Sequence, residues 1–241
     1  MSATDSGATH AWSHASDEAS VLSREETRLP TLLSVIAGMV DLISFLTLGN
    51  IFTAHITGNL VVIAAALVRG GPLNLAQALA IPVFILGVAA AWLLASAWGR
   101  PGPSLTRLLL VIQFLLLAGL LVFSVVTNPS VSPHGLMAGI AVMIAVSAMA
   151  CQFALLRLAL PGAPSTAVMT GNLTNTVLSV LDSLSRSQPL RTGGTERLGR
   201  SLYVLSGFLG GCVVAAAAVS LLGDWAWSCP VALAGVAVAW R

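Results

Sequence analysis

Long apolar runs alternate with short polar or Gly/Pro-rich breaks along most of the chain. Several runs approach the roughly 20 residues that a helix needs to cross the hydrocarbon of a bilayer. They therefore predict an all-α integral membrane protein, a bundle of membrane-spanning helices. The apolar segments cover approximately residues 30–48, 51–68, 74–98, 105–127, 134–158, 165–182, 200–222 and 229–240.

A polar tetrapeptide occurs twice within this apolar sequence. Thr57-Gly58-Asn59-Leu60 returns as Thr170-Gly171-Asn172-Leu173. Downstream of each copy, FILGVAAAWLLASAWG (84–99) resembles FLGGCVVAAAAVSLLG (208–223). These matches indicate that the membrane domain contains an internal repeat.

The repeat predicts two related halves, 30–127 and 134–241. A weaker upstream match brings Asp41 and Gln152 into similar places of the two halves. If each half crosses the membrane three times, the halves are inverted relative to one another, and if each crosses four times, they are parallel. Both arrangements occur in transporters, with binding sites at the interface between the repeats.

The two segments that carry the tetrapeptide are short, which leaves the number of crossings open between six and eight. Basic residues favour cytoplasmic loops. If all eight segments cross and the N-terminus is inside, Arg100, Arg107 and Arg157 lie outside. If both tetrapeptide segments enter and leave on the same side, Arg69 is the only arginine outside. The charge rule therefore favours about six spans, with a cytoplasmic N-terminus.

Composition supports the membrane class and excludes others. Hydrophobic residues make up 56% of the chain and charged residues 8%, whereas charged residues make up about 25% of typical soluble domains. A net charge of +2 is too small and dispersed to indicate nucleic-acid binding. Residues 1–29 are polar, lack apolar clusters and predict a disordered tail. We expect 30–241 to form the transmembrane domain.

Asp41 lies deep inside the first apolar run, in LLSVIAGMVDLISFLTLG. An ionisable group at such a depth costs several kcal/mol and usually faces the protein interior or a water-filled cavity. Two interpretations remain open. Asp41 is a proton or cation site, or it is a structural residue that is protonated or hydrogen-bonded to a neighbouring helix.

The tetrapeptide also has two interpretations. Glycine permits unusual backbone angles and close approach, while Thr and Asn supply groups that satisfy a broken helix or coordinate a polar solute. Thr57, Gly58 and Asn59, with Thr170, Gly171 and Asn172, then form short or discontinuous segments at a binding site. The alternative is helix packing, in which the small residues permit close contact and Asn bonds across the bundle.

His55 lies two residues before the first tetrapeptide, where the second copy has Val168. Beside Asp41 it would complete a proton relay; the commoner explanation is an interfacial histidine at a segment end. In the second half, Gln152 and Asn175 add uncharged polar groups. They complete the set of residues that we expect to bind substrate.

No catalytic residues are predicted, because HExxH, GxSxG, P-loop and paired-carboxylate patterns are absent from the sequence. We expect no enzyme activity and no cofactor. Neither the cysteines nor the histidines have metal-ligand spacing, so no metal site is expected either.

The run GMVDLISFLTLGNIFTAHITGNL, with the later PSTAVMTGNLTNTVLSVL, resembles the YoaK-like bacterial membrane proteins, the DUF1275 or UPF0700 family. Gly38, Asp41, Phe52 and the first Thr-Gly-Asn match the first part of the family pattern, and the second Thr-Gly-Asn matches the rest. The chain differs at Ala150, where a glycine is expected. The resemblance implies a multi-pass protein of the bacterial inner membrane and supplies no substrate.

The leading hypothesis from these features is a secondary transporter or permease for a small solute or ion, embedded in the lipid bilayer. Asp41 and the two Thr-Gly-Asn segments would line its central site. The alternative is a non-transporting membrane sensor, scaffold or lipid-binding protein that uses the tail and the Arg-rich loop at 185–200 as contact surfaces.

Overall fold

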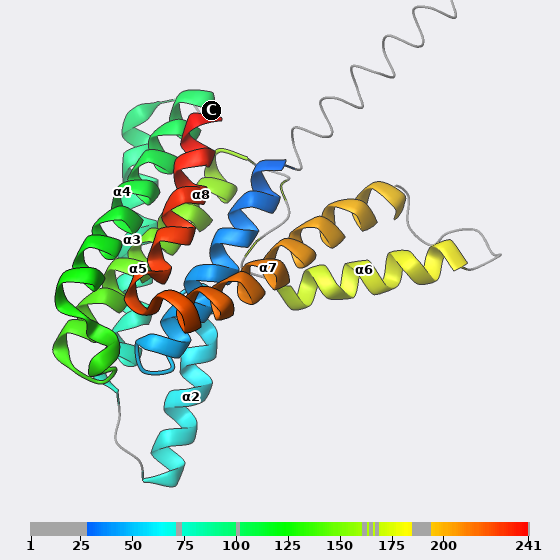
Figure 1. Ribbon diagram of the computed structural model, residues 1–241. Coiled ribbons are helices and arrows are strands. Elements are labelled where there is room, and N and C mark those ends of the chain that lie inside the picture. Colours follow the sequence, from blue (N-terminus) through cyan, green and yellow to red (C-terminus); the bar gives the residue numbers. More distant parts are fainter. Residues whose placement is uncertain are drawn as a thin grey trace, which may run out of the picture.

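The computed structural model describes residues 28–70, 74–99, 102–160, 163, 166, 169–184 and 194–240. All regular elements in these ranges are helical (Figure 1). Arg28 and Leu29 begin the first helix, and the rest of the predicted tail lies outside the described residues. The helices are the N-helix (Arg28–Thr47), α2 (Ile56–Arg69), α3 (Leu75–Trp98), α4 (Pro103–Thr127), α5 (Leu136–Leu158), α6 (Met169–Leu184), α7 (Gly194–Leu222) and α8 (Ser228–Ala239), with short 3-10 turns η1 (Pro129–Val131) and η2 (Gly223–Trp227).

The all-α membrane fold predicted from the apolar runs is confirmed. Five helical stretches are long and apolar enough to cross a membrane: the N-helix, α3, α4, α5 and the continuous stretch Leu198–Ala239. The last comprises most of α7 together with η2 and α8, between which the chain reverses direction (Figure 1). α7 begins at Gly194, earlier than the apolar run at 200, so part of the predicted Arg-rich loop is helical.

Local chemistry explains where the helices begin and end. The side chain of Asn74 accepts a hydrogen bond from the backbone N–H of Ala76 and caps α3. Pro103 lies in the first turn of α4, where its missing N–H costs nothing. The N-helix ends because Gly49 and Asn50 both have positive φ angles, 83° and 59°. This left-handed pair begins the non-helical stretch 48–55, which we call the first break.

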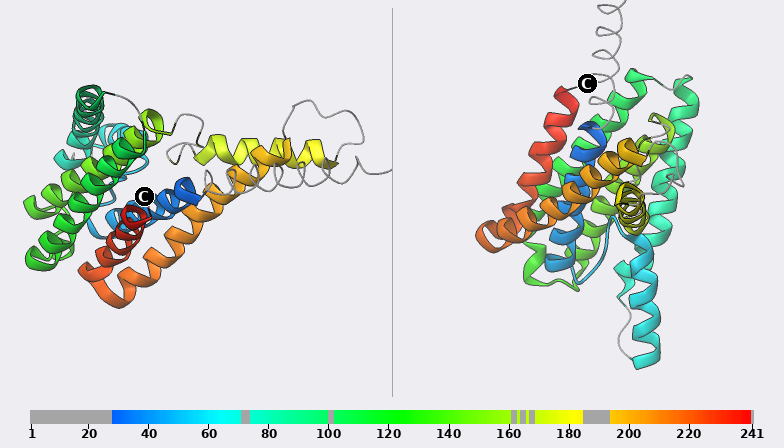
Figure 2. Two further views of the ribbon diagram at one scale, coloured as in Figure 1. Left: turned by 90° about the horizontal axis from the view of Figure 1, so that it is seen from above. Right: turned by 90° about the vertical axis from the view of Figure 1, so that its right-hand side faces the viewer.

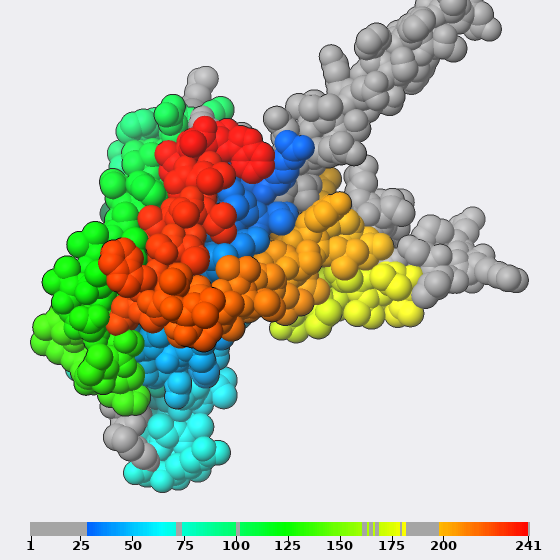
Figure 3. All heavy atoms as spheres, in the orientation of Figure 1, coloured from blue at the N-terminus to red at the C-terminus, as the bar shows by residue number. Residues whose placement is uncertain are grey.

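The two halves of the chain are inverted relative to one another. In Figure 1 the N-helix runs downward while α5, its counterpart in the repeat, runs upward. The right-hand view of Figure 2 agrees with this order and shows α3 rising and α7 descending. α4 and α8 are likewise opposed. Figure 3 shows α2 standing out below the body of the molecule, and α6 and α7 extending to its right.

Helices are exchanged between the halves. α5 of the second half packs along α3 of the first, and α4 packs against α8. The N-helix packs just as closely on α7, because a Cβ atom built on Gly38 would collide with the carbonyl oxygen of Phe208. Gly211 lies in the same way against the carbonyl oxygen of Val35. Glycines on both helices therefore permit the close crossing of the N-helix and α7.

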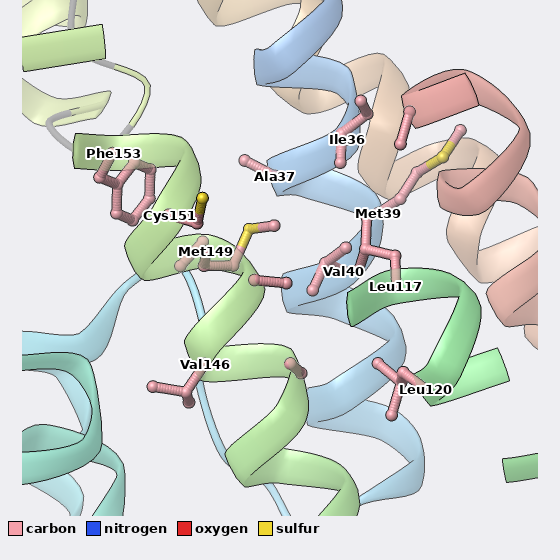
Figure 4. Close-up of a cluster of buried hydrophobic side chains, with 14 of the residues drawn as sticks. Ile36, Ala37, Met39, Val40, Leu117, Leu120, Val146, Met149, Cys151 and Phe153 are labelled. Atoms are coloured by element: carbon pink, nitrogen blue, oxygen red, sulfur yellow. The ribbon is translucent and has the colours of Figure 1, made fainter. Parts of the chain in front are cut away.

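The N-helix and α5 form the centre of the bundle. Within the most apolar 18-residue stretch of each helix, 67% of the N-helix and 72% of α5 is buried, against 11% of α3. Figure 4 shows Met149 of α5 directed toward the N-helix near Val40, with Leu117 of α4 on the other side of that helix. Asp41 of the N-helix and Gln152 of α5 are thus placed inside the protein rather than against lipid.

Candidate functional site

The first break is built around the carboxylate of Asp41. Its Oδ1 accepts hydrogen bonds from the backbone N–H groups of Thr53 (2.7 Å) and Ala54 (2.8 Å), and a longer one from that of His55 (3.4 Å). Three successive N–H groups directed at one oxygen form an anion-binding nest. The arrangement ties the non-helical stretch to the N-helix through one side-chain oxygen.

Asp41 also compensates for a missing helix cap. His55, at the N-cap position of α2, makes no side-chain capping bond. The N-terminus of a helix carries unsatisfied N–H groups and a partial positive charge. The carboxylate of the N-helix lies beside this N-terminus and supplies the negative charge that the local sequence lacks.

His55 completes the arrangement. Its Nδ1 lies 2.7 Å from Oδ2 of Asp41, and 32% of the histidine side chain is exposed against 6% of the aspartate. The imidazole ring also packs edge-on against Phe208 of α7, with centroids 5.1 Å apart. The aspartate–histidine proximity that the sequence raised as one alternative is present in the structure, and it lies where the N-helix meets α7.

The tetrapeptide forms the first turn of α2, where Asn59 is buried and reaches back to the break. Its Oδ1 accepts the backbone N–H of Phe52 (3.0 Å), and its Nδ2 donates to the carbonyl oxygen of the same residue (2.7 Å). Gly58 leaves room for the Phe52 ring, which a Cβ atom would approach to 3.0 Å. Thr57 is exposed. The first Thr-Gly-Asn thus positions the backbone of the break.

A related but uncharged arrangement lies before α6. Nε2 of Gln152 donates to the carbonyl oxygen of Leu33 (2.9 Å) and approaches the hydroxyl of Thr166 (3.3 Å). Its Oε1 accepts from the side chain of Gln113 at 2.7 Å. Thr166 precedes α6 by as many residues as Thr53 precedes α2. Gln152 therefore takes, in the second half, a place related to that of Asp41, beside a threonine three residues before the short helix.

The second Thr-Gly-Asn forms the first turn of α6, as the first copy does in α2. Asn172 is buried, and Thr170 is exposed. Gly171 and Asn175 are half-buried. The two threonines thus occupy matching exposed positions, and the two asparagines matching buried ones.

The N-helix contacts both polar arrangements. Asp41 holds the first break, while the carbonyl oxygen of Leu33 on the same helix accepts a hydrogen bond from Gln152. These N-helix residues are separated by two turns, roughly 12 Å at about 1.5 Å per residue.

The sequence did not identify Gln113, Thr53 or Thr166 as site residues. The spacing of Thr53 and Thr166 to the two tetrapeptides is the only signal that could have indicated these threonines.

A cavity of about 620 Å³ adjoins the first break between the starts of α3 and α5. Asn74 and His134 line its polar side, and its remaining walls are mainly apolar. A Cβ atom on Gly49 would lie 2.7 Å from the carbonyl oxygen of Pro133 and 3.0 Å from Nδ1 of His134. The backbone of the break is therefore in direct contact with the cavity lining. Over the described ranges, no three His, Cys, Asp or Glu side chains gather to hold a metal ion.

Comparison with known proteins places the chain in a family. The family described as "Protein of unknown function (DUF1275)" matches residues 29–240. The chain is also 29% identical over 194 residues to the UPF0700 transmembrane protein YoaK of Bacillus subtilis (strain 168), an alignment that covers 78% of this chain and 82% of the relative. No solved structure matches. With its apolar helices and this match over nearly the whole described chain, the protein is a multi-pass membrane protein that belongs to the DUF1275 family.

Proposed function

We propose that this protein is a proton-coupled secondary transporter for a small solute. The observation that carries the proposal is the Asp41–His55 pair, placed at a break within the first of two inverted halves and against α7 of the second. Inverted repeats with discontinuous helices are the architecture in which secondary transporters bind substrates and coupling ions. Ionisable residues buried in membrane helices are expensive and typically mark ion or proton pathways.

The pair is suited to binding a proton. His55 is partly exposed, whereas Oδ1 of Asp41 is enclosed by backbone N–H groups. With a neutral ring, Nδ1–H donates a hydrogen bond to the carboxylate. With a protonated ring, both partners of the same contact are charged, and the hydrogen bond becomes an ion pair. Proton binding at His55 thereby tightens the contact between the first break and the N-helix.

The solute site of the proposal is the cavity between the starts of α3 and α5. Its volume of about 620 Å³ falls within the range of small-molecule sites, about 300–1,000 Å³. Because Gly49 of the break packs against Pro133 and His134 in the cavity wall, movement of the break alters the shape of the cavity. This contact links proton binding to solute binding.

We place the N-terminus on the cytoplasmic side of the bacterial inner membrane. Arg28, Arg107 and Arg157 lie at helix ends that share the upper end of the bundle, whereas Arg69 ends α2 at the lower end (Figure 1). Basic residues concentrate on the cytoplasmic side of membrane proteins. The distribution supports the upper end as the inner one.

The test is solute-driven proton movement into proteoliposomes that contain a pH-sensitive dye, measured across a panel of small solutes. Asp41→Asn keeps an oxygen for the N–H groups of the break and offers an N–H to His55 but removes the charge. We expect Asp41→Asn and His55→Gln to abolish the signal at unchanged yield of monodisperse protein. Asp224→Asn is the matched control, because Asp224 is also buried and accepts a hydrogen bond from Ser130, away from the break.

Several outcomes would contradict the proposal. Undiminished proton movement in Asp41→Asn would remove the pair from the mechanism, and no signal with any solute would count against transport. Parallel loss of folded protein and of signal in the Asp41 variant would favour a structural role instead. The observation that favours this second candidate, a non-transporting membrane sensor or scaffold, is that Oδ1 of Asp41 and the amide of Asn59 bind backbone groups of the break.

A further inference from the structure

A groove of about 570 Å³ runs between α3 and the C-terminal part of α5. It is separate from the first break and from the cavity beside it. Its walls are almost entirely apolar. The residues that define it include Phe84, Val88, Ala89 and Trp92 of α3, with Phe153 and Arg157 of α5.

The groove is open toward the outer surface of the bundle. Phe84 and Phe153 form its floor, with ring centroids 5.9 Å apart, and Figure 4 shows Phe153 directed away from the N-helix. Trp92 is 55% exposed at its edge. Since α3 is the least buried of the long helices, this surface faces the surrounding hydrocarbon. The molecules that can fill the groove are therefore membrane lipids.

Arg157 gives the groove one charged end. It lies in the last turn of α5 and is exposed. Among the described residues, His55 and Asp41 form an ion pair, whereas no carboxylate pairs with Arg157. Trp92 near the same end is a residue type that favours the membrane interface. An apolar slot with an unpaired cation at its interfacial end matches a lipid with an anionic headgroup.

We propose that the groove binds an anionic phospholipid, with an acyl chain between α3 and α5 and the phosphate on Arg157. Arg157 lies at the same end of the bundle as Arg28 and Arg107 (Figure 1). Anionic lipids attract basic residues at the cytoplasmic surface of membranes, and this end carries the arginines. Guanidinium groups bind phosphate oxygens through paired N–H donors.

The test is native mass spectrometry of the full chain in detergent, titrated with dioleoyl-phosphatidylglycerol or with dioleoyl-phosphatidylcholine. One basic residue near an anionic surface predicts about fivefold tighter binding of phosphatidylglycerol. Arg157→Gln should remove this preference. Arg107→Gln, the same charge change at an exposed position on the same end, should preserve it.

A second pair of variants tests the acyl-chain slot. Ala89 is exposed and lines the groove, whereas its neighbour Ala90 is exposed and does not line it. Ala89→Trp should reduce binding of both lipids at least fivefold, and Ala90→Trp should leave it unchanged. Equal binding of the two lipids by the unsubstituted protein, or equal effects of the paired variants, would overturn the proposal. Asp41→Asn should not affect lipid binding, so this test is independent of the proposed transport.

Discussion

The crossing of the N-helix and α7 depends on glycine, and one substitution tests this directly. A Cβ atom at Gly211 would overlap the carbonyl oxygen of Val35 in the N-helix. That oxygen belongs to the helix backbone and cannot rotate away as a side chain would. Gly211→Ala must therefore push the two helices apart. The same crossing holds Phe208 against His55, so the displacement reaches the candidate site.

The expected cost follows from two opposing effects. Overpacking a close contact costs about 1–3 kcal/mol, and a rigid backbone partner places the cost near the upper end. Replacing a helical glycine with alanine stabilises the helix by up to about 1 kcal/mol. The net expectation is about 2 kcal/mol of destabilisation. At the adjacent Gly210, a Cβ atom meets nothing within 4 Å, so Gly210→Ala should stabilise the protein by up to about 1 kcal/mol.

The measurement is SDS-induced unfolding of the purified protein in detergent micelles, followed by helical circular dichroism. The two neighbouring alanine variants should shift the midpoint in opposite directions. If both shift the same way, or if Gly211→Ala unfolds together with the unsubstituted protein, the close crossing is absent in solution. The orientation of His55 against α7 would then need another explanation.

Two further predictions concern the break and the topology. Asn59→Ala removes both hydrogen bonds to the backbone of the break and should lower the free energy of unfolding in SDS by about 2 kcal/mol. The control Thr57→Ala, at an exposed position, should change this free energy by less than about 0.5 kcal/mol. Equal effects of the two variants would show that the asparagine does not hold the break. In a cysteine-free background, Arg69→Cys should react with a membrane-impermeant maleimide added to intact cells and Gly102→Cys only after lysis, and the reverse pattern would invert the proposed orientation.

The elements of the fold follow from the sequence because length and polarity determine them. Each apolar run of about 20 residues became a helix, and the polar tetrapeptides marked the starts of the two short helices α2 and α6. The depth of Asp41 indicated a residue inside the bundle, where it lies with 5% exposure. These predictions rest on the cost of exposing polar groups to hydrocarbon, which does not depend on partners.

The packing partners could not be predicted in the same way. In a soluble protein the apolar face of a helix marks its buried side, but lipid is as apolar as a protein core. The sequence of α3 is therefore as hydrophobic as that of α5, although one lies at the periphery and the other at the centre. The hydrogen bond between Gln113 and Gln152 joins residues of different halves, and no local sequence pattern predicts it.

The role of Asn59 shows why even a well-recognised motif was ambiguous. Both interpretations of Thr-Gly-Asn, a broken helix at a site and close packing between helices, require small and polar residues. In the structure, the amide of Asn59 pairs with both backbone groups of a single residue, Phe52, in the first break, as expected of a group that satisfies a broken helix. This contact depends on the path of the chain after Gly49 and Asn50, which the composition of the motif does not encode.

The exchange of helices constrains how this protein can move if it transports. Because the N-helix packs on α7 and α5 packs on α3, neither half of the sequence is a separate body. Rocking of one half against the other would break both crossings, including the contact of Gly211 with a backbone carbonyl. A rearrangement that keeps each crossed pair intact and moves one pair against the other would instead break contacts between the pairs, such as the hydrogen bond from Gln152 to Leu33. The first break then connects the two bodies, because it joins the N-helix to α2 and touches the cavity wall beside α3 and α5.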